Sequence, residues 1–223
     1  MKVFIHVGLQ KTGTTALQEL VFRKMDVNYV RYLDREIYSM TLDETRPLLI
    51  SNEDLCGTPH MLYARGGDRY QMARNLAGLF PNANIIVGVR NHDTWLKSMY
   101  YESVRQGLCM GYKRFSEVFP KDMLDFNKYI VELTRLFHNV YVYSFEELQQ
   151  DFDKVVNGIC EFIGVEPPAY VDRKMNLSLK GWQIPGFRLM NRFLYSKEAN
   201  PNGFIPKAFF YYWYNLIRED GLQ

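Results

Sequence analysis

Glycines, threonines and one lysine lie close together near the amino terminus, in the string HVGLQKTGTTAL at residues 6–17. An apolar run comes before Gly8 and a helical pattern begins near Thr14, so the string predicts a strand, a turn and a helix. Backbone N–H groups at such a helix start point into the turn, and the helix dipole adds positive potential. The sequence therefore predicts a loop that holds an anionic group, with the hydroxyls of Thr12, Thr14 and Thr15 as further donors.

The position of the lysine separates this loop from that of nucleotide kinases and hydrolases. Gly8 and Gly13 match the two glycines of the pattern GxxxxGK[ST], but Thr14 occupies the position of its lysine. Lys11 lies two residues before Gly13, so it approaches the bound group from another side. The simpler structural alternative is that the threonines only cap a helix, a position where Ser and Thr are favoured.

An arginine and a serine form a second candidate anion site. Residues 85–105 read IIVGVRNHDTWLKSMYYESVR, which predicts a strand that ends at Arg90 and a helix that begins around Asp93. Ser98 lies eight residues after Arg90, about one turn into that helix. A guanidinium at the end of a strand and a hydroxyl on the next helix can converge on one phosphate. A surface arginine and an exposed serine are the structural alternative.

A carboxylate follows a third predicted strand. The run PLLIS at residues 47–51 ends in Asn52, Glu53 and Asp54, and the carboxyl ends of parallel strands meet at one edge of a sheet. We therefore expect Glu53 at the same edge as the two anion elements, in the role of general base. His60 is the rival for that role. Carboxylates at strand ends are also often caps or solvated loop residues, and Asp54 is the better candidate for a cap.

The string GLQKTGTTAL closely resembles the 5′-phosphosulfate loop of sulfotransferases that use 3′-phosphoadenosine 5′-phosphosulfate (PAPS). It is most similar to glycosaminoglycan N-sulfotransferase-like and bacterial carbohydrate members of that family. The resemblance implies that Lys11 contacts the bridging oxygen between phosphate and sulfate. It also implies that Thr12, Gly13, Thr14 and Thr15 hold the 5′-phosphate. Ala16 departs from the hormone- and phenol-type members, which carry an adenine-stacking tryptophan there, so the adenine platform is unassigned.

The same resemblance implies the reaction and the second half of the nucleotide site. A sulfuryl group would move from PAPS to a hydroxyl or amine by in-line displacement, without a metal, and leave 3′-phosphoadenosine 5′-phosphate (PAP). The spacing of Arg90 and Ser98 resembles the 3′-phosphate element. Carbohydrate-type members commonly use a Glu as base and phenol-type members a His, so Glu53 and His60 both stay candidates.

A carbohydrate or glycolipid is the first candidate acceptor. The alternatives to a sulfotransferase are a P-loop nucleotide kinase or hydrolase, which would need magnesium and a lysine where Thr14 stands, and a non-catalytic nucleotide-binding protein on the same fold.

Residues 165–223 are predicted to be loop-rich and helical, and to form a lid or an acceptor region. Arg173, Lys174 and Lys180 lie where family members bring a basic loop over the nucleotide, but an ordinary charged surface loop is the simpler explanation. The aromatic run FFYYWYNLI at residues 209–217 predicts contact with the acceptor, a partner or a membrane surface. A helix that buries one aromatic face is the simpler alternative there.

The elements that must position these residues follow from the hydrophobic pattern. Strands are predicted at residues 2–8, 47–51, 84–89 and 140–144, and helices at 126–137 and 152–163, the latter ended by Gly164. Strands rich in Val and Ile that alternate with helices predict a mostly parallel sheet covered on both faces. We expect a P-loop-like, three-layer α/β fold in a single domain over residues 1–223.

Charge and cysteine content narrow the function classes. The 27 Lys and Arg against 25 Asp and Glu give a net charge of +2, which is too small for a general nucleic-acid binder. Cys56, Cys109 and Cys160 show no metal-binding spacing, so they are predicted to be free thiols in a reducing compartment. No run approaches the roughly 18 apolar residues of a membrane span. The sequence therefore predicts a cytoplasmic protein without a transmembrane segment.

Overall fold

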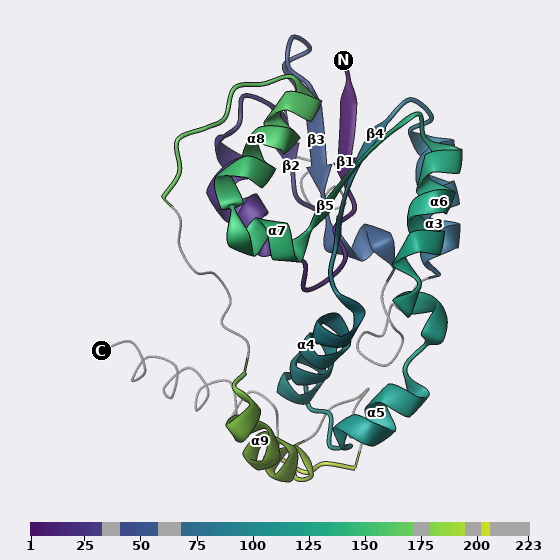
Figure 1. Ribbon diagram of the computed structural model, residues 1–223, viewed down its shortest axis with the longest axis vertical. Coiled ribbons are helices and arrows are strands. Elements are labelled where there is room, and N and C mark those ends of the chain that lie inside the picture. The colour runs from purple at the N-terminus through teal and green to yellow at the C-terminus, as the bar shows by residue number, and fades with distance from the viewer. Residues whose placement is uncertain (33–40, 58–67, 172–178, 195–201, 206–223) are drawn as a thin grey trace. The chain divides into compact units, whose positions relative to one another are not determined.

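Five parallel strands form the sheet that carries the predicted site residues (Figure 1). The computed structural model describes residues 1–32, 41–57, 68–171, 179–194 and 202–205. The strands are β1 (Val3–His6), β2 (Asn28–Val30), β3 (Leu48–Ser51), β4 (Asn84–Val89) and β5 (Asn139–Ser144), in the order β2-β3-β1-β4-β5. The four predicted strands are confirmed. The short strand β2 was missed because three residues are too few to show a period of two.

The strand order brings the three predicted site loops to one place. β1 pairs with β3 on one side and with β4 on the other, so the direction of winding reverses at β1. In open parallel sheets, ligands bind at the carboxyl ends of the strands where this reversal occurs. The loops that follow β1, β3 and β4 carry Lys11, Glu53 and Arg90, respectively.

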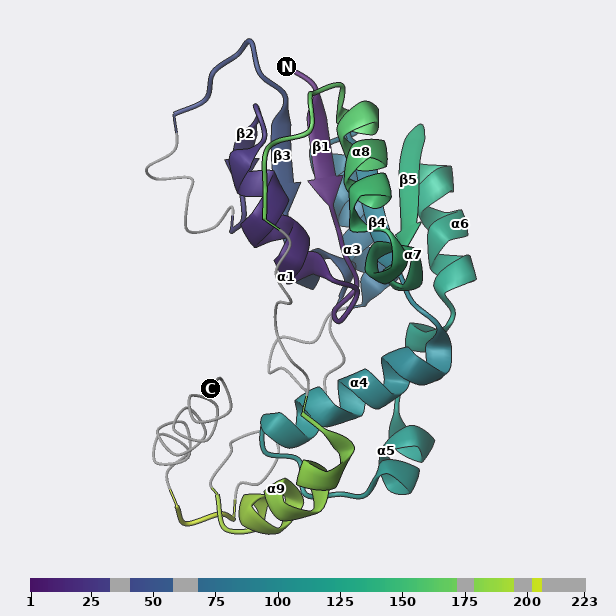
Figure 2. The same cartoon turned by 60° about the vertical axis from the view of Figure 1, so that its left-hand side comes forward.

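Helices cover both faces of the sheet. Helices α6 (Phe126–Leu136) and α8 (Phe152–Ile163) both contact β5, and Figures 1 and 2 show them on opposite sides of it. Helix α3 (Arg69–Leu79) packs against α6, and α7 (Phe145–Gln150) leads into α8. On the α8 face, the core joins side chains of the strands to those of the first helix and of α8, namely Phe4, Leu49, Ile86, Leu17, Val21, Val156 and Ile159.

The two predicted helices have clear local causes. The side chain of Asp151 accepts a hydrogen bond from the Lys154 amide at 2.9 Å at the start of α8, and Gly164 ends the helix in the left-handed conformation with φ 84°. The side chain of Asp125 caps α6 in the same way, at 2.9 Å from the Lys128 amide. Apolar residues recur on one face of each helix, so the sequence alone determined both elements.

A buried arginine side chain lies between helices α3 and α6. The side chain of Arg69, the first residue of α3, is 0% exposed. Its guanidinium carbon lies 5.0 Å from the ring centroid of Tyr129 and 5.9 Å from that of Phe126, both on α6. Desolvating a charge costs several kcal/mol, whereas a desolvated cation–π contact contributes about 2 kcal/mol or somewhat more. The two rings therefore offset only part of the cost.

The contacts of the chain divide it into two units. The first comprises the described residues up to Trp95 and those from Pro120 to 171, and contains the sheet. The second contains the described residues 96–119, 179–194 and 202–205. Helix α4 (His92–Arg105) begins in the first unit and ends in the second. A single domain over the whole chain stays a prediction.

The second unit is helical in its described part. It holds most of α4, α5 (Tyr112–Val118), a 3₁₀ turn at Gly181–Gln183 and α9 (Ile184–Asn191). The buried amide of Asn191 donates to the carbonyl oxygens of Val104 and Leu108, at 2.7 and 3.0 Å, and so joins α9 to the end of α4. Across the described residues of both units, no helix is long and apolar enough to span a membrane.

Candidate active site

The loop after β1 has an unusual backbone. Lys11 adopts φ 66°, and Gly13 adopts φ 85° directly before α1 (Thr14–Ala16). Left-handed backbone is uncommon for a lysine and costs of order 1–3 kcal/mol, so such residues concentrate where the surrounding structure holds them for a purpose. Alternating right- and left-handed residues turn successive amides into a concave anion site. The predicted strand, loop and helix are therefore present, with a backbone suited to an anion.

The glycines of the loop allow it to pack closely. A Cβ at Gly8 would lie 2.5 Å from the hydroxyl oxygen of Thr14, and one at Gly13 would collide with Leu148 of α7. The Thr12 hydroxyl donates to the carbonyl oxygen of Leu9 at 2.5 Å, so it stabilises the loop itself. Thr12 and Thr14 are buried, whereas Thr15 is only half-buried.

Arg90 joins the end of β4 to this loop. Its Nη1 donates to the carbonyl oxygen of Lys11 at 2.9 Å, and its Nε to the hydroxyl of Thr94 at 3.1 Å. The guanidinium carbon lies 4.2 Å from the ring centroid of Phe145 at the start of α7. Burial lowers the pKa of Arg90, and the nearby Glu146 carboxylate opposes that shift. The two predicted anion elements are therefore in contact through Arg90 and Lys11.

A side chain of the loop also holds the turn that carries Glu53. Glu53 begins a 3₁₀ turn, η3 (Glu53–Cys56), directly after β3. The amide of Gln10 donates to the carbonyl oxygens of Glu53 and Gly57, at 3.2 and 3.3 Å. The Trp95 indole donates in turn to the carbonyl oxygen of Gln10 at 2.7 Å. Gln10 thus ties the candidate base to the loop.

Two outcomes at this turn differ from the sequence predictions. The cap is Asn52, whose side chain accepts from the Asp54 amide at 2.9 Å, so the assignment of Asp54 as the cap was wrong. The Asn52 side chain provides the hydrogen-bond acceptor for the first free amide of the turn. The side chain of Asp54 is not needed for this and stays exposed. Gln10 received no role from the sequence, because its partners lie more than forty residues away and leave no local pattern.

A buried polar chain lies beneath the loop. The two ring nitrogens of His6 hydrogen-bond to the hydroxyls of Ser51 and Tyr143, at 2.8 and 3.0 Å. Tyr143 belongs to β5 and passes over β4 at Gly88, where a Cβ would lie 2.5 Å from the phenol. Thr12 and Thr14 lie near the same phenol. The loop therefore rests on side chains from β1, β3 and β5.

The remaining predicted site residues lie on other parts of the chain. Ser98 lies on α4 in the second unit; it is 7% exposed, and its hydroxyl has no hydrogen-bond partner among the described residues. Convergence of Arg90 and Ser98 on one phosphate stays a prediction. His60, Arg173, Lys174 and the aromatic run at 209–217 lie outside the described residues. The three cysteines are free thiols, as predicted.

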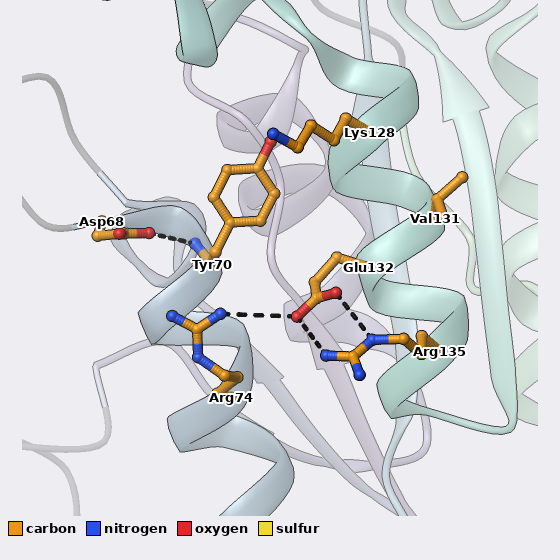
Figure 3. A pocket seen from close by; sticks show the side chains of 7 residues that line it. All are labelled: Asp68, Tyr70, Arg74, Lys128, Val131, Glu132 and Arg135. Carbon is orange, nitrogen blue, oxygen red and sulfur yellow. Dashed lines mark hydrogen bonds and ion pairs between the residues drawn. The ribbon is translucent and has the colours of Figure 1, made fainter.

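Two hollows open on the first unit. A groove of about 580 Å³ runs between α3 and α6, where Glu132 pairs with both Arg74 and Arg135 (Figure 3). It contains none of the predicted site residues. A smaller hollow of about 250 Å³ adjoins the end of β4 and is lined by Arg90 and His92, among others. Within the described part of the chain, no cluster of His, Cys, Asp or Glu is arranged to hold a metal.

A family model for the sulfotransferase domain matches residues 2–220. The chain belongs to the sulfotransferase family. It is thus an enzyme of sulfuryl transfer, which disfavours the non-catalytic alternative. A search of curated proteins gives no match.

Solved sulfotransferases share the fold. One from Alicyclobacillus acidocaldarius superposes with a TM-score of 0.53 at 16% identity, over 86% of this chain and 93% of the other. The mouse sulfotransferase SULT7A1, complexed with PAP, gives 0.51 at 16% identity, over 93% of this chain and 68% of the other. The predicted α/β sulfotransferase fold is therefore confirmed.

The buried histidine of this sulfotransferase should make its stability depend on pH. Burial lowers the pKa of His6 from 6.5 to about 3. Below pH 6.5 the unfolded chain binds a proton that the folded chain excludes, so acid favours unfolding. Between pH 7.5 and 5, His6 should contribute a loss of about 2 kcal/mol in unfolding free energy.

Chemical denaturation across this pH range checks the effect of His6. The variant His6→Asn removes the titrating ring, so its stability should fall less steeply with acid than that of the wild type. Equal slopes for the two proteins would show that His6 is not the source.

Proposed function

We propose that this sulfotransferase takes its sulfuryl group from PAPS and leaves PAP, and that the loop at Lys11–Thr15 and Arg90 hold the nucleotide. The observation that carries the proposal is the left-handed backbone of Lys11 and Gly13 at the carboxyl end of β1, with the Arg90 guanidinium against the Lys11 carbonyl. This arrangement fits a 5′-phosphosulfate group. Amides at the start of a helix and the ammonium group of Lys11 are the donors that such an anion requires, and Arg90 holds the Lys11 backbone in place.

The two halves of the nucleotide are assigned to different residues. Thr12, Gly13, Thr14 and Thr15 bind the 5′-phosphate through their amides and the hydroxyl of Thr15. Arg90 and Ser98 bind the 3′-phosphate. The buried Ser98 hydroxyl, which has no partner among the described residues, supports this role, because buried polar groups are otherwise nearly always paired.

Lys11 and Glu53 perform the chemistry in this proposal. Glu53 accepts the proton of the acceptor hydroxyl or amine as its oxygen or nitrogen forms a bond to sulfur. The bond between sulfur and the bridging oxygen breaks, and Lys11 stabilises the negative charge that collects on that oxygen. Positioning supplies most of the rate, as in phosphoryl transfer. Gln10 holds the Glu53 turn against the loop, so base and donor keep a fixed geometry.

The acceptor is assigned by chemistry alone. We propose a hydroxyl or amine of a carbohydrate or glycolipid, as in the carbohydrate-type members that the loop resembles. A carboxylate directly after β3 supports this assignment, because a Glu base is common in those members.

Nucleotide binding tests the donor assignment. In the presence of a chelator, PAP should raise the unfolding temperature, with a stabilisation of about 2.7 kcal/mol at a concentration 100 times its Kd. Magnesium should have no effect, because phosphate binding here uses backbone amides and Arg90. Differential scanning fluorimetry with PAP and with ATP–magnesium measures the two shifts in unfolding temperature. A larger shift with ATP–magnesium than with PAP would favour a P-loop kinase and remove PAPS as the donor.

A further inference from the structure

A buried cation lies where α3 meets α6, and no anion among the described residues hydrogen-bonds to it. The guanidinium of Arg69 is fully buried, and its three nitrogens have no hydrogen-bond partner among the described residues. An arginine keeps its charge at any pH that a protein experiences. Unsatisfied buried groups are rare in folded proteins, and those that persist are often part of a functional site.

The groups around Arg69 are donors as well. The phenol hydroxyls of Tyr70 and Tyr129 are buried and have no hydrogen-bond partner in the described part of the chain. The rings of these two tyrosines pack edge to face, with centroids 6.2 Å apart. The thiol of Cys56 is also nearby, and burial raises its pKa to about 12, so it stays protonated. The cluster therefore combines a positive charge with two phenol hydroxyls that are free to donate, and the described residues use none of these donors.

In the described part of the chain, no carboxylate is seated against the Arg69 guanidinium, although Glu53 and Asp54 act on the neighbouring Cys56. No carboxylate of the described residues hydrogen-bonds to Arg69. The carboxylate of Asp68 accepts from the amides of Tyr70 and Gln71 at 2.7 and 3.1 Å, and Glu132 pairs with Arg74 and Arg135 across the groove (Figure 3). The sequence between η3 and α3, residues 58–67, reads TPHMLYARGG and contains no acidic residue. Among the described residues, Arg69 therefore has no hydrogen-bonded anion.

We propose that Arg69, Tyr70 and Tyr129 form a binding site for a small oxyanion, a carboxylate or a sulfate group. A guanidinium presents paired N–H groups that match two oxygens of such an anion, and the phenol hydroxyls add further donors. The site adjoins η3, the turn that begins at Glu53 and ends at Cys56, because η3 packs against α3. The inference rests on the cluster and not on the choice of PAPS as donor.

Thermal unfolding of the full chain tests the site. Sodium acetate, sodium sulfate and sodium glucuronate are compared with sodium chloride at equal ionic strength. The unfolding temperature of the wild type should rise with the concentration of at least one of these oxyanions and then reach a plateau. The variant Arg69→Met should lose that gain. In chloride it should unfold about 2–4 °C higher than the wild type, because it no longer buries an unpaired charge.

The control is Arg74→Met on the same helix. Arg74 is half-exposed and pairs with Glu132, so this variant should respond to the anions as the wild type does. The comparison also cancels the general salt effect of sulfate and any binding at the phosphate loop. A response to acetate or sulfate identifies a site for a free ion, whereas a response to glucuronate alone identifies an anionic sugar.

Identical anion responses in the wild type and Arg69→Met would overturn the proposal. If Arg69→Met does not fold, Tyr129→Phe removes only one hydroxyl and should raise the half-saturating concentration several-fold. An unchanged value in Tyr129→Phe would then overturn it. PAP binding is measured on each variant as a separate readout, so failure of the oxyanion site and failure of the donor assignment can be told apart.

Discussion

Replacing Glu53 by glutamine should lower kcat by about 10²–10⁴-fold, the usual contribution of general acid–base catalysis, and leave the affinity for PAP almost unchanged. Glutamine keeps the size and polarity of the side chain but cannot accept a proton. The backbone of residue 53 should keep its place, because Gln10 and Cys56 donate hydrogen bonds to its carbonyl oxygen. Turnover and nucleotide binding should therefore respond differently.

The neighbouring carboxylate provides the control for this experiment. Asp54 is exposed and does not cap the turn, so Asp54→Asn should retain most of the activity. His60→Ala tests the rival base and should have a much smaller effect than Glu53→Gln. Transfer of labelled sulfate to a panel of glycans, lipids, amino sugars and phenols provides the measurement. Near-full turnover in Glu53→Gln with a true acceptor would make Glu53 structural and direct attention to His60.

Replacing Arg90 by alanine should remove the preference for nucleotides that carry a 3′-phosphate. Truncating one partner of a desolvated charge pair costs roughly 2–5 kcal/mol, which corresponds to a factor of about 30–5,000 in the ratio of the two affinities. The guanidinium is half-buried, and this burial lowers its pKa. Calorimetry with PAP and with adenosine 5′-phosphate measures the ratio.

The ratio of the affinities for PAP and adenosine 5′-phosphate separates two effects of Arg90→Ala. Arg90 also donates to the carbonyl oxygen of Lys11, so its loss should loosen the loop and weaken both nucleotides alike. Only a direct contact with the 3′-phosphate changes one affinity relative to the other. The variant Thr94→Val, which removes the partner of Arg90 Nε, should leave the ratio nearly intact. An unchanged ratio in Arg90→Ala would exclude this residue from the 3′-phosphate site.

The sequence was most informative where local chemistry decides the structure. Strand β4 and helix α8 have the predicted ends, because a Val- and Ile-rich run and an amphipathic repeat with a glycine stop depend on neighbouring residues only. The loop after β1 was also predicted this way, since its glycines, its lysine and its threonines are contiguous in the chain.

The contacts that hold the site together are long-range and left no such pattern. The bond between His6 and Tyr143 joins residues 137 positions apart, and the left-handed backbone of Lys11 depends on what packs around the loop. Gln10 and Arg69 have neighbours that only the folded chain brings close. Gly88 offers a signal that was not used, because a glycine inside a strand often marks the close approach of another group, here Tyr143.

The close contact between Gly88 of β4 and Tyr143 of β5 should couple the evolution of these two strands. The Tyr143 phenol occupies the space that a side chain at position 88 would fill, so neither position can change freely while the other stays as it is. A relative with a larger residue on β4 at this point must carry a smaller one on β5, and it must support the loop after β1 by other means. The pair should therefore covary among homologues, and glycine at this position should accompany an aromatic residue that reaches beneath the loop.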